Sequence, residues 1–237
     1  MIDAHIHIQA MSPDKLLKAK KAGVSAWFVN AAEKDDWAKI EALAAEMLEL
    51  KPFYGLHPWY AGQKGDNYAK ELSAFLEKYP KAGVGEIGLD KLKPWDGQEE
   101  LFKMQLEIAA RYNRVVSVHA VKAASEVLYA LQEYKNKLPA IIMHAFAGPV
   151  HLVPAFKDCG AYFSISPFFL RKKPKIQKQL LSAIPWERLL LETDAPDGAE
   201  PDFLPEMIQK IAEIASFAPE ELRKITAENA KRLLSHE

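Results

Sequence analysis

The chain begins with Met1-Ile2-Asp3-Ala4-His5-Ile6-His7-Ile8, a short apolar run that contains two histidines one residue apart. Side chains at positions i and i+2 of a β-strand point to the same face, so His5 and His7 can aim at one point. Two imidazoles that converge on one point make half of a metal site. An isolated His-x-His is as often a pair of ordinary half-buried histidines, and the rest of the chain has to decide between the two interpretations.

Runs of the same kind recur along the whole chain. Short stretches rich in β-branched or aromatic residues occupy residues 2–8, 24–30, 52–57, 83–88, 115–119, 140–144, 161–166 and 189–194. Longer stretches with apolar residues at helical spacing occupy residues 35–50, 67–79, 98–112, 121–135 and 175–183. Strands that alternate with helices predict parallel βαβ units, and eight such units in about this length are what a (βα)8 TIM barrel requires. From about residue 203 the chain is typical of two closing helices, the second starting near residue 218.

The position of the polar residues decides between a barrel and an open doubly wound sheet. They fall at the C-terminal ends of successive predicted strands: His5, His7, Asn30, His57, Glu86, His119, His144, Ser166, Glu192 and Asp194. In a barrel all these ends surround one mouth, whereas an open sheet would spread them along an edge. We therefore predict an α/β protein in which residues 1–237 form a single barrel domain, closed by C-terminal helices.

Length, composition and charge limit the class of protein. The 237 residues are 49% hydrophobic, which is enough to bury a large core. The formal charge of −1 gives no global basic field, although a local patch or metal ions can still attract nucleic acid. The single cysteine, Cys159, excludes an internal disulfide and fits a reducing compartment. The sequence has no apolar run of membrane-spanning length, so we expect a cytoplasmic protein with no membrane contact and no obligate protein partner.

Residues able to bind a metal recur at the predicted barrel mouth. They are His5, His7, Glu86, His119, His144 and Asp194. Four imidazoles and two carboxylates are too many ligands for one tetrahedral ion, and they suit two divalent ions that share a bridging carboxylate. Mixed nitrogen and oxygen ligands fit Zn, Mn, Mg, Co or Ni without choosing among them.

Ordered motifs carry these residues or lie beside them. They are His5-Ile6-His7, Gly55-Leu56-His57-Pro58, Gly85-Glu86-Ile87-Gly88-Leu89-Asp90, Val118-His119, His144-Ala145-Phe146-Ala147-Gly148 and Leu191-Glu192-Thr193-Asp194-Ala195-Pro196. The set resembles the motifs of the TatD-type metal-dependent hydrolases of the amidohydrolase superfamily, over nearly the whole chain. The tail from Glu228-Asn229-Ala230 to Leu233-Leu234 is also similar to the last helix of that family.

The resemblance implies a (βα)8 barrel with a binuclear metal centre. Members of the family are mostly described as deoxyribonucleases, and some act as 3′–5′ exonucleases. Carried over by position, His5, His7 and Asp194 would hold one ion, and His119 with His144 the other. Glu86 would bridge the two ions, in place of the carboxylated lysine of other superfamily members.

The chain departs from the family pattern on the substrate side. Trp59 stands where the family often has a second histidine, and Val121 stands where an arginine is common. Residues 145–148 replace a frequent Cys-Phe-Ser-Gly. After Pro196, a short acidic stretch at residues 197–202 replaces a loop usually rich in Arg, Lys, Asn and Pro. The residues at the metal positions are kept. These changes therefore bear on which substrate is bound rather than on the type of reaction.

The predicted reaction is attack of a metal-activated water on a phosphodiester. Asp194 would ligate one ion and act as general base towards that water. Glu192 shares a strand face with Asp194 and would orient it or a ligand histidine. A buried ion pair with a lysine or arginine is the alternative role of Glu192.

Two kinds of residue could contact the substrate. His57 would donate to a phosphate oxygen, with a structural hydrogen bond as the alternative. Trp59 and Tyr60 could stack on a base, or could only cover the barrel.

Basic residues follow two of the predicted strands. The run Arg171-Lys172-Lys173 follows the seventh strand, where barrels often bind phosphate, and would replace the missing basic loop. A solvated helix start is the alternative. Lys91 and Lys93, just after Asp90, are weaker candidates for the same contact with phosphate.

Three function classes remain open from sequence. A metal-dependent deoxyribonuclease is preferred, and the resemblance implies the 3′–5′ exonuclease type. A hydrolase of a small amide, lactone or phosphate ester on the same centre fits the acidic loop and the near-neutral charge. A metal-binding scaffold without catalysis is the third, and retention of Asp194 argues against it.

Overall fold

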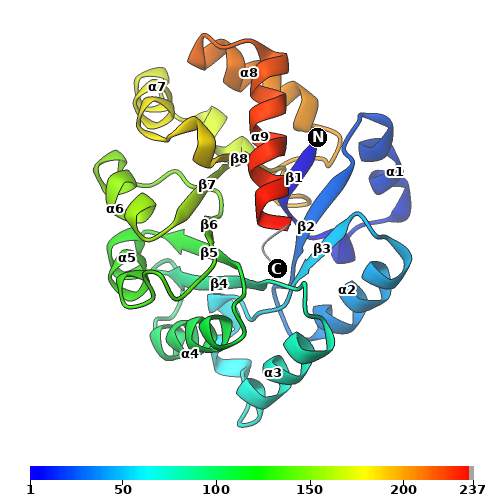
Figure 1. The fold of residues 1–237 in the computed structure, drawn as a ribbon, viewed down its shortest axis with the longest axis vertical. Helices are drawn as coiled ribbons and strands as arrows, with labels where there is room; N and C mark the ends of the chain where they lie inside the picture. The colour runs from blue at the N-terminus through cyan, green and yellow to red at the C-terminus, as the bar shows by residue number, and fades with distance from the viewer. Residues whose placement is uncertain (235–237) are drawn as a thin grey trace.

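The protein folds as a ring of parallel strands enclosed by helices, which confirms the predicted (βα)8 barrel (Figure 1). The computed structural model describes residues 1–234. The strands within this range are β1 (Ile2–Ile6), β2 (Ala26–Asn30), β3 (Leu50–Phe53), β4 (Val84–Asp90), β5 (Val116–Val121), β6 (Ile141–Met143), β7 (Ala161–Ile165) and β8 (Leu189–Leu191). Their side chains are largely buried on both faces, as expected for parallel strands covered by helices.

Backbone hydrogen bonds close the ring at two seams. β1, β2 and β3 form one parallel sheet, and β4 to β8 form a second. Between β3 and β4 the Gly83 N–H donates to the Pro52 carbonyl at 2.9 Å. Between β8 and β1 the Asp194 N–H donates to the His5 carbonyl at 3.1 Å. The last and first strand ends are therefore neighbours, and His5 lies beside Asp194.

A buried carboxylate reinforces the seam between β8 and β1. Asp3 is fully buried and accepts the Thr193 N–H at 2.9 Å and the Thr193 hydroxyl at 2.5 Å. It also accepts the His5 N–H at 3.3 Å. Three hydrogen bonds on one buried side chain fix the register of the seam, so the spacing of His5 and Asp194 does not depend on the loops alone.

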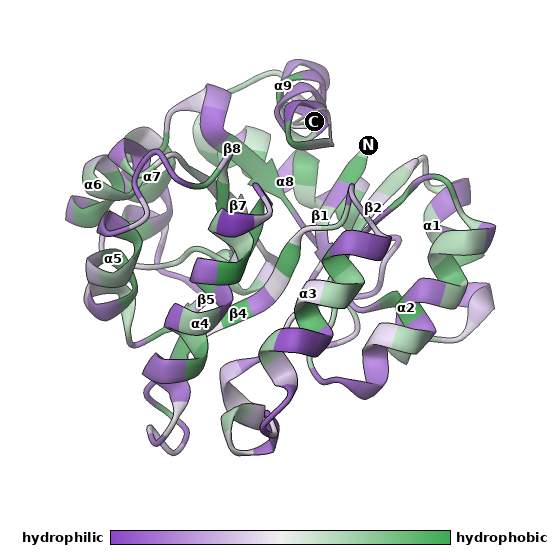
Figure 2. Ribbon diagram, turned by 60° about the horizontal axis from the view of Figure 1, so that its bottom comes forward, coloured by the Kyte–Doolittle hydropathy of each residue, from purple (hydrophilic) through white to green (hydrophobic). Residues whose placement is uncertain are grey.

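Helices alternate with the strands and form the outer layer. In Figure 2, hydrophilic and hydrophobic residues alternate along α2, α3 and α4, as amphipathic helices on a barrel require. The helices are α1 (Pro13–Lys21), α2 (Asp35–Glu46), α3 (Tyr68–Lys78), α4 (Gln98–Arg111), α5 (Ala124–Gln132), α6 (Val153–Asp158), α7 (Pro174–Ala183), α8 (Leu204–Ala215) and α9 (Pro219–Leu234). Among the described residues, no helix combines the length and the apolar character needed to span a membrane.

The predicted elements are all present, with shifted ends. β3 begins and ends earlier than predicted, because the chain after Phe53 leaves the strand and leads into a 3-10 turn at Pro58–Gln63. α5 is shorter than predicted at both ends. α1 and α6 were not singled out from sequence, because α1 is rich in lysine and α6 has only six residues.

Apolar side chains fill the N-terminal end of the barrel, and α9 covers that end (Figure 1). The buried cluster there consists of Ile2, Ala4, Phe28, Phe53, Val115, Ala140, Ile142, Tyr162, Leu190, Ala230 and Leu233. Ala230 and Leu233 come from α9, which therefore acts as the floor of the barrel. A larger cluster packs between the strands and the other helices.

One lysine is buried at this floor. The Lys51 ammonium donates to the Leu233 carbonyl and lies 6.0 Å from the ring centroids of Phe28 and Phe53. Burial lowers the pKa of Lys51 to about 8. The bond gives a carbonyl in the last described turn of α9 a hydrogen-bond donor from outside the helix.

Candidate metal centre

The residues predicted to bind metal converge at the C-terminal ends of the strands. Their positions are His5 in β1, His7 directly after it, Glu86 in β4, His119 in β5, His144 directly after β6 and Asp194 in the loop after β8. All are at most 9% exposed. The structure thus brings together every residue of the predicted metal set.

Glu86 lies at the centre of the cluster, with its two oxygens facing different histidines. Oε2 is 3.2 Å from Nε2 of His5 and 3.5 Å from Nε2 of His7. Oε1 is 2.8 Å from Nδ1 of His119 and 3.6 Å from Nε2 of His144. A carboxylate with each oxygen directed at a separate imidazole group has the arrangement that a bridge between two cations needs.

Asp194 faces the same cluster from the opposite strand. Its Oδ1 lies 3.9 Å from Nε2 of His144 and 4.0 Å from Nε2 of His5 and of His7. Its φ of 54° is left-handed, a conformation that aspartate tolerates better than most residues. Burial, with repulsion from nearby carboxylates such as Glu192, raises the pKa of Asp194 to about 8. Crowded buried carboxylates of this kind favour a bound cation.

The outer ring nitrogens of His5 and His7 each face an oxygen atom. Nδ1 of His7 is 2.8 Å from the Asn30 carbonyl oxygen, which can only accept. Nδ1 of His5 is 3.2 Å from the Ser117 hydroxyl oxygen. Donation from each Nδ1 leaves the lone pair of Nε2 directed at the cluster, which is the tautomer of a metal-ligating histidine.

His144 and His119 are held in the same way by carboxylates. Nδ1 of His144 is 2.9 Å from Oε1 of Glu192, the same oxygen that accepts the Ala145 N–H at 2.8 Å. Nε2 of His119 is 3.2 Å from Oδ2 of Asp90, so its Nδ1 faces the cluster. Glu192 therefore contacts a histidine of the predicted metal set.

His57 differs in its hydrogen bonds from the four histidines of the predicted metal set. Its Nδ1 accepts the Trp59 N–H at 3.2 Å, so the neutral ring carries its proton on Nε2. That Nε2 lies 3.4 Å from Oε1 of Glu86. A protonated nitrogen donates a hydrogen bond and has no lone pair for a metal. The hydrogen-bond network thus favours His57 as a donor, although it lies close enough to Glu86 and His119 to complete a metal-capable group.

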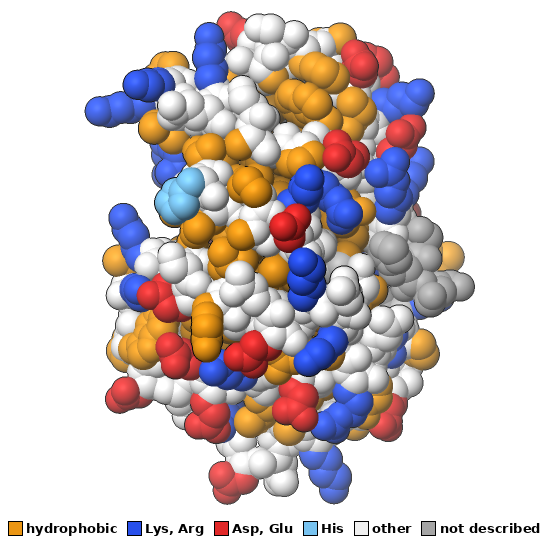
Figure 3. All heavy atoms as spheres, turned by 60° about the vertical axis from the view of Figure 1, so that its left-hand side comes forward, with side chains coloured by type: hydrophobic (Ala, Val, Ile, Leu, Met, Phe, Trp, Pro, Cys, Tyr) orange, Lys and Arg blue, Asp and Glu red, His pale blue; other side chains and the backbone are white. Residues whose placement is uncertain are grey.

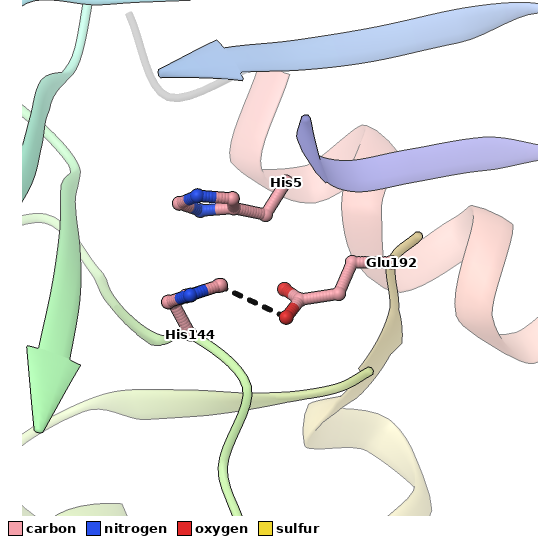
Figure 4. A group of neighbouring side chains, drawn as sticks. All are labelled: His5, His144 and Glu192. Carbon is pink, nitrogen blue, oxygen red and sulfur yellow. Dashed lines mark ion pairs between the residues drawn. The ribbon is translucent and has the colours of Figure 1, made fainter. Parts of the chain in front are cut away.

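Figure 4 shows how His5, His144 and Glu192 lie against one another. The two imidazole rings are stacked, with centroids 3.6 Å apart and planes 24° from parallel. Burial and the charge of His144 lower the pKa of His5 to about 4. Burial opposes protonation of His144, but Glu192, Glu86 and Asp194 raise its pKa to about 10.

The donor set fits divalent ions. Four histidines each direct a ring nitrogen at the cluster, two carboxylates lie between them, and Glu192 adds a further buried carboxylate. Borderline cations such as Zn²⁺, Mn²⁺ or Co²⁺ take this mixture of nitrogen and oxygen ligands. A bound cation would offset the repulsion among the carboxylates that now raises the pKa of Asp194.

Sequence reasoning gave no role to Asp90, which the structure places beside the cluster. Oδ2 of Asp90 accepts the Trp59 indole N–H at 2.7 Å and faces His119. Burial opposes its ionisation, but hydrogen bonds from His119 and Trp59 lower the pKa of Asp90 to about 2. The sequence spacing could have indicated this position. Asp90 is four residues after Glu86 in one strand, and an even spacing keeps both side chains on the same face of the strand.

Trp59 lies at the rim with its indole anchored. Its side chain is 52% exposed, and the Lys93 ammonium lies 4.4 Å from its ring centroid. Tyr60 is half-buried and packs against the outer core. Only Trp59 of this pair therefore offers an exposed aromatic surface.

The predicted basic run divides into residues with different surroundings. The exposed Arg171 guanidinium lies 4.8 Å from the Phe168 ring centroid. Lys172 lines a cavity at the mouth, together with Lys91, whereas Lys173 is exposed. The structure therefore places Lys172 in the wall of a cavity and Arg171 against an aromatic ring.

The family model described as "TatD related DNase" matches residues 2–235. The chain belongs to the TatD family. The "3'-5' ssDNA/RNA exonuclease TatD" of Pantoea ananatis is 30% identical over 234 residues, covering 91% of this chain and 90% of the relative. The "Uncharacterized metal-dependent hydrolase YabD" of Bacillus subtilis is 30% identical over 257 residues, covering 98% of each chain.

Solved structures agree with this membership. The crystal structure of YjjV, a TatD homologue from Escherichia coli, has a TM-score of 0.89 at 26% identity and covers 98% of this chain and 97% of that chain. A TatD family hydrolase from Entamoeba histolytica has a TM-score of 0.86 at 18% identity, which shows likeness of fold alone. Membership confirms the family, the barrel and the metal-dependent hydrolase class predicted from the sequence.

Proposed function

We propose that the protein is a binuclear metal-dependent nuclease that hydrolyses phosphodiester bonds of single-stranded DNA or RNA, as a 3′–5′ exonuclease. The observation that carries the proposal is Glu86, with one carboxylate oxygen towards His5 and His7 and the other towards His119 and His144. The printed activity of the TatD relatives supports the choice of substrate.

We assign His5, His7 and Asp194 to one ion, His119 and His144 to the other, and Glu86 to the bridge. The ions would supply Lewis acidity, activating the attacking water and offsetting the phosphate charge. Zn, Mn, Mg, Co and Ni remain the candidate metals. The polar partners of the outer ring nitrogens support this assignment, since in all four histidines the other ring nitrogen faces Glu86.

The remaining residues would move a proton and position the substrate. Asp194 would take the proton of the attacking water, because its carboxylate faces the proposed metal ligands, with Oδ1 3.9 Å from Nε2 of His144. His57 would donate its Nε2 proton to a phosphate oxygen. Trp59 would stack on a base at the rim, held in place by Asp90.

The whole chain would act as one domain, in the cytoplasm, where a buried Cys159 stays reduced. No protein partner is needed for the site, because all its proposed ligands come from one chain.

The test is a turnover assay on metal-free protein supplied in turn with Mg, Mn, Zn, Co and Ni. The substrates are 5′-labelled single-stranded DNA, RNA and duplex DNA, beside a panel of small amides, lactones and phosphate esters. The proposal expects metal-dependent shortening of single strands from the 3′ end. Turnover confined to small esters would favour the second function, which the acidic residues Asp197, Glu200 and Asp202 support. No turnover of any substrate would favour a metal-binding scaffold.

A further inference from the structure

A cavity of about 680 Å³ lies beside the metal centre, at the ends of β4 to β7. Its wall includes Ala120, which follows His119, and Ala145, which follows His144. A group bound in the cavity would therefore be next to the proposed reaction site. The volume is within the range of small-molecule sites and suits a nucleotide-sized group.

Three lysines from different loops line this cavity: Lys91, Lys122 and Lys172. Lys91 is paired with Glu126, which also lines the cavity, at 2.5 Å. Within residues 1–234, no ion pair is found for Lys122 or Lys172. The cavity thus holds two positive charges that are not ion-paired among these residues, and they would attract an anion.

The backbone around the cavity favours the same kind of ligand. Ala124, Ser125 and Glu126 are the first residues of α5, whose N-cap Ala123 offers no side-chain hydrogen bond. The positive end of the helix dipole therefore faces the cavity. Lys122 itself has a φ of 55°, an uncommon conformation for a lysine, at the turn that leads into this helix.

The positive charge is local to this part of the mouth. On the face formed by α5, α6 and α7, basic and acidic side chains are interspersed (Figure 3). On the β8 side of the mouth the loop carries Asp197, Glu200 and Asp202, and Glu200 is paired with Lys15 at 2.8 Å. A polyanion would be attracted to the lysine side of the centre and repelled from the acidic side.

We propose that this lysine cavity binds a second phosphate of the substrate strand, the one adjacent to the phosphodiester being cut. The proposal rests on the proposed function, because it requires a strand with more than one phosphate. It makes Lys122 and Lys172 specificity residues, which distinguish a nucleic-acid strand from a substrate with a single phosphate. It also explains how a chain with an acidic loop after Asp194 can still retain a strand.

The experiment compares three thymidine dinucleotides that differ only in phosphate number: TpT, pTpT and TpTp. Steady-state kinetics are measured with the metal-loaded enzyme, for the wild type and for the double variant Lys122→Gln/Lys172→Gln. The wild type should show a KM about tenfold lower for one of the two phosphorylated forms than for TpT, as expected for a charge-assisted contact. The double variant should lose that difference and leave kcat and KM for TpT unchanged.

Lys173→Gln is the matched control, because it removes the same charge one residue from Lys172 without touching the cavity. It should behave as the wild type on all three substrates. Hydrolysis of all three with equal KM by the wild type, or a double variant that weakens TpT equally, would overturn the lysine site alone. Shortening of labelled single strands without hydrolysis of pTpT or TpTp would also overturn the lysine site, because the added phosphate would then give no productive binding. No hydrolysis of dinucleotides or of single strands with any of the five metals would contradict the proposed function, and the lysine site with it.

Discussion

The N-terminal end of the barrel is packed with apolar side chains, whereas the C-terminal end gathers five imidazoles and four carboxylates, each within 4.0 Å of an oppositely typed neighbour. The same strands supply both ends. At the floor the inward residues are Ile2, Phe28, Ile142 and Leu190, and α9 closes the end. At the mouth the inward polar side chains come partly from strand residues, such as His5, and partly from residues that follow the strands, such as His144 and Asp194.

The two ends therefore differ in role: the floor contributes to stability, and the mouth carries the residues proposed for catalysis. The floor gains hydrophobic stabilisation and excludes water, while the mouth accepts buried charge that only a bound cation can offset. Three residues at the mouth, Lys122, Ala145 and Asp194, also have a positive φ in loops that follow strands. Substitutions at the mouth should therefore affect turnover, and substitutions at the floor should affect folding.

The largest effect is expected for Asp194→Asn. The amide cannot accept the proton of the attacking water, so kcat should fall by about 10²–10⁴-fold. The fold should persist, because the Asp194 side chain is not part of a packed core. Steady-state kinetics with matched metal loading measure the loss, and circular dichroism checks the fold. Activity equal to that of the wild type would remove Asp194 from the proton-transfer role.

The second effect belongs to the floor. Leu233→Ala removes a fully buried side chain of α9 and should lower the free energy of unfolding by about 2–5 kcal/mol. The kcat of the remaining folded protein should not change, since the metal centre lies at the other end. Urea denaturation provides the measurement. A large loss of kcat with unchanged stability would contradict the division between the two ends.

The third largest effect is expected for a substitution of Gly88 at the mouth. Gly88 has a φ of 145°, and a Cβ there would lie 2.0 Å from the His119 carbonyl oxygen. Gly88→Ala should destabilise the protein by about 1–3 kcal/mol and displace His119, lowering turnover as well. Gly62→Ala is the control, since a Cβ at Gly62 has no other atom within 4 Å. Equal behaviour of the two variants would show that the β4–β5 contact tolerates a side chain.

The smallest effect is a pH dependence at the floor. The folded-state pKa of Lys51 is lowered by burial to about 8, against 10.5 for the free group, so the unfolded chain binds more protons between these values. The stability of the wild type relative to Lys51→Met should therefore rise with pH, by at most about 1.4 kcal/mol between pH 8 and 9. Urea denaturation at both pH values gives the difference. A flat or falling difference would show that Lys51 does not carry a depressed pKa.

The sequence predicted the barrel and the convergence of six side chains able to bind metal, because both depend on backbone periodicity. Side chains two residues apart share a strand face, and parallel strands end at one edge, so His5, His7, Glu86 and His119 could be placed without coordinates. The helix ends and the short α6 were less predictable, since capping and loop geometry determine them.

Side-chain partnerships could not be predicted from spacing. The protonated nitrogen of His57 depends on the Trp59 N–H in a 3-10 turn, and the role of Asp90 depends on which rotamer His119 adopts. Arg171 and Lys172 are neighbours with the same charge, yet only Lys172 lines the cavity. Such differences arise from loop conformation, which sequence periodicity does not determine.

The central claim is that Glu86 joins two ions in one centre. The most direct test is to dialyse metal-free protein against Mn²⁺ or Zn²⁺ and measure bound metal per chain by mass spectrometry, for the wild type and for Glu86→Gln. The account predicts two ions per wild-type chain and fewer in the variant, whose amide cannot bridge two cations. A single ion per wild-type chain at saturation, or two ions in both proteins, would contradict it.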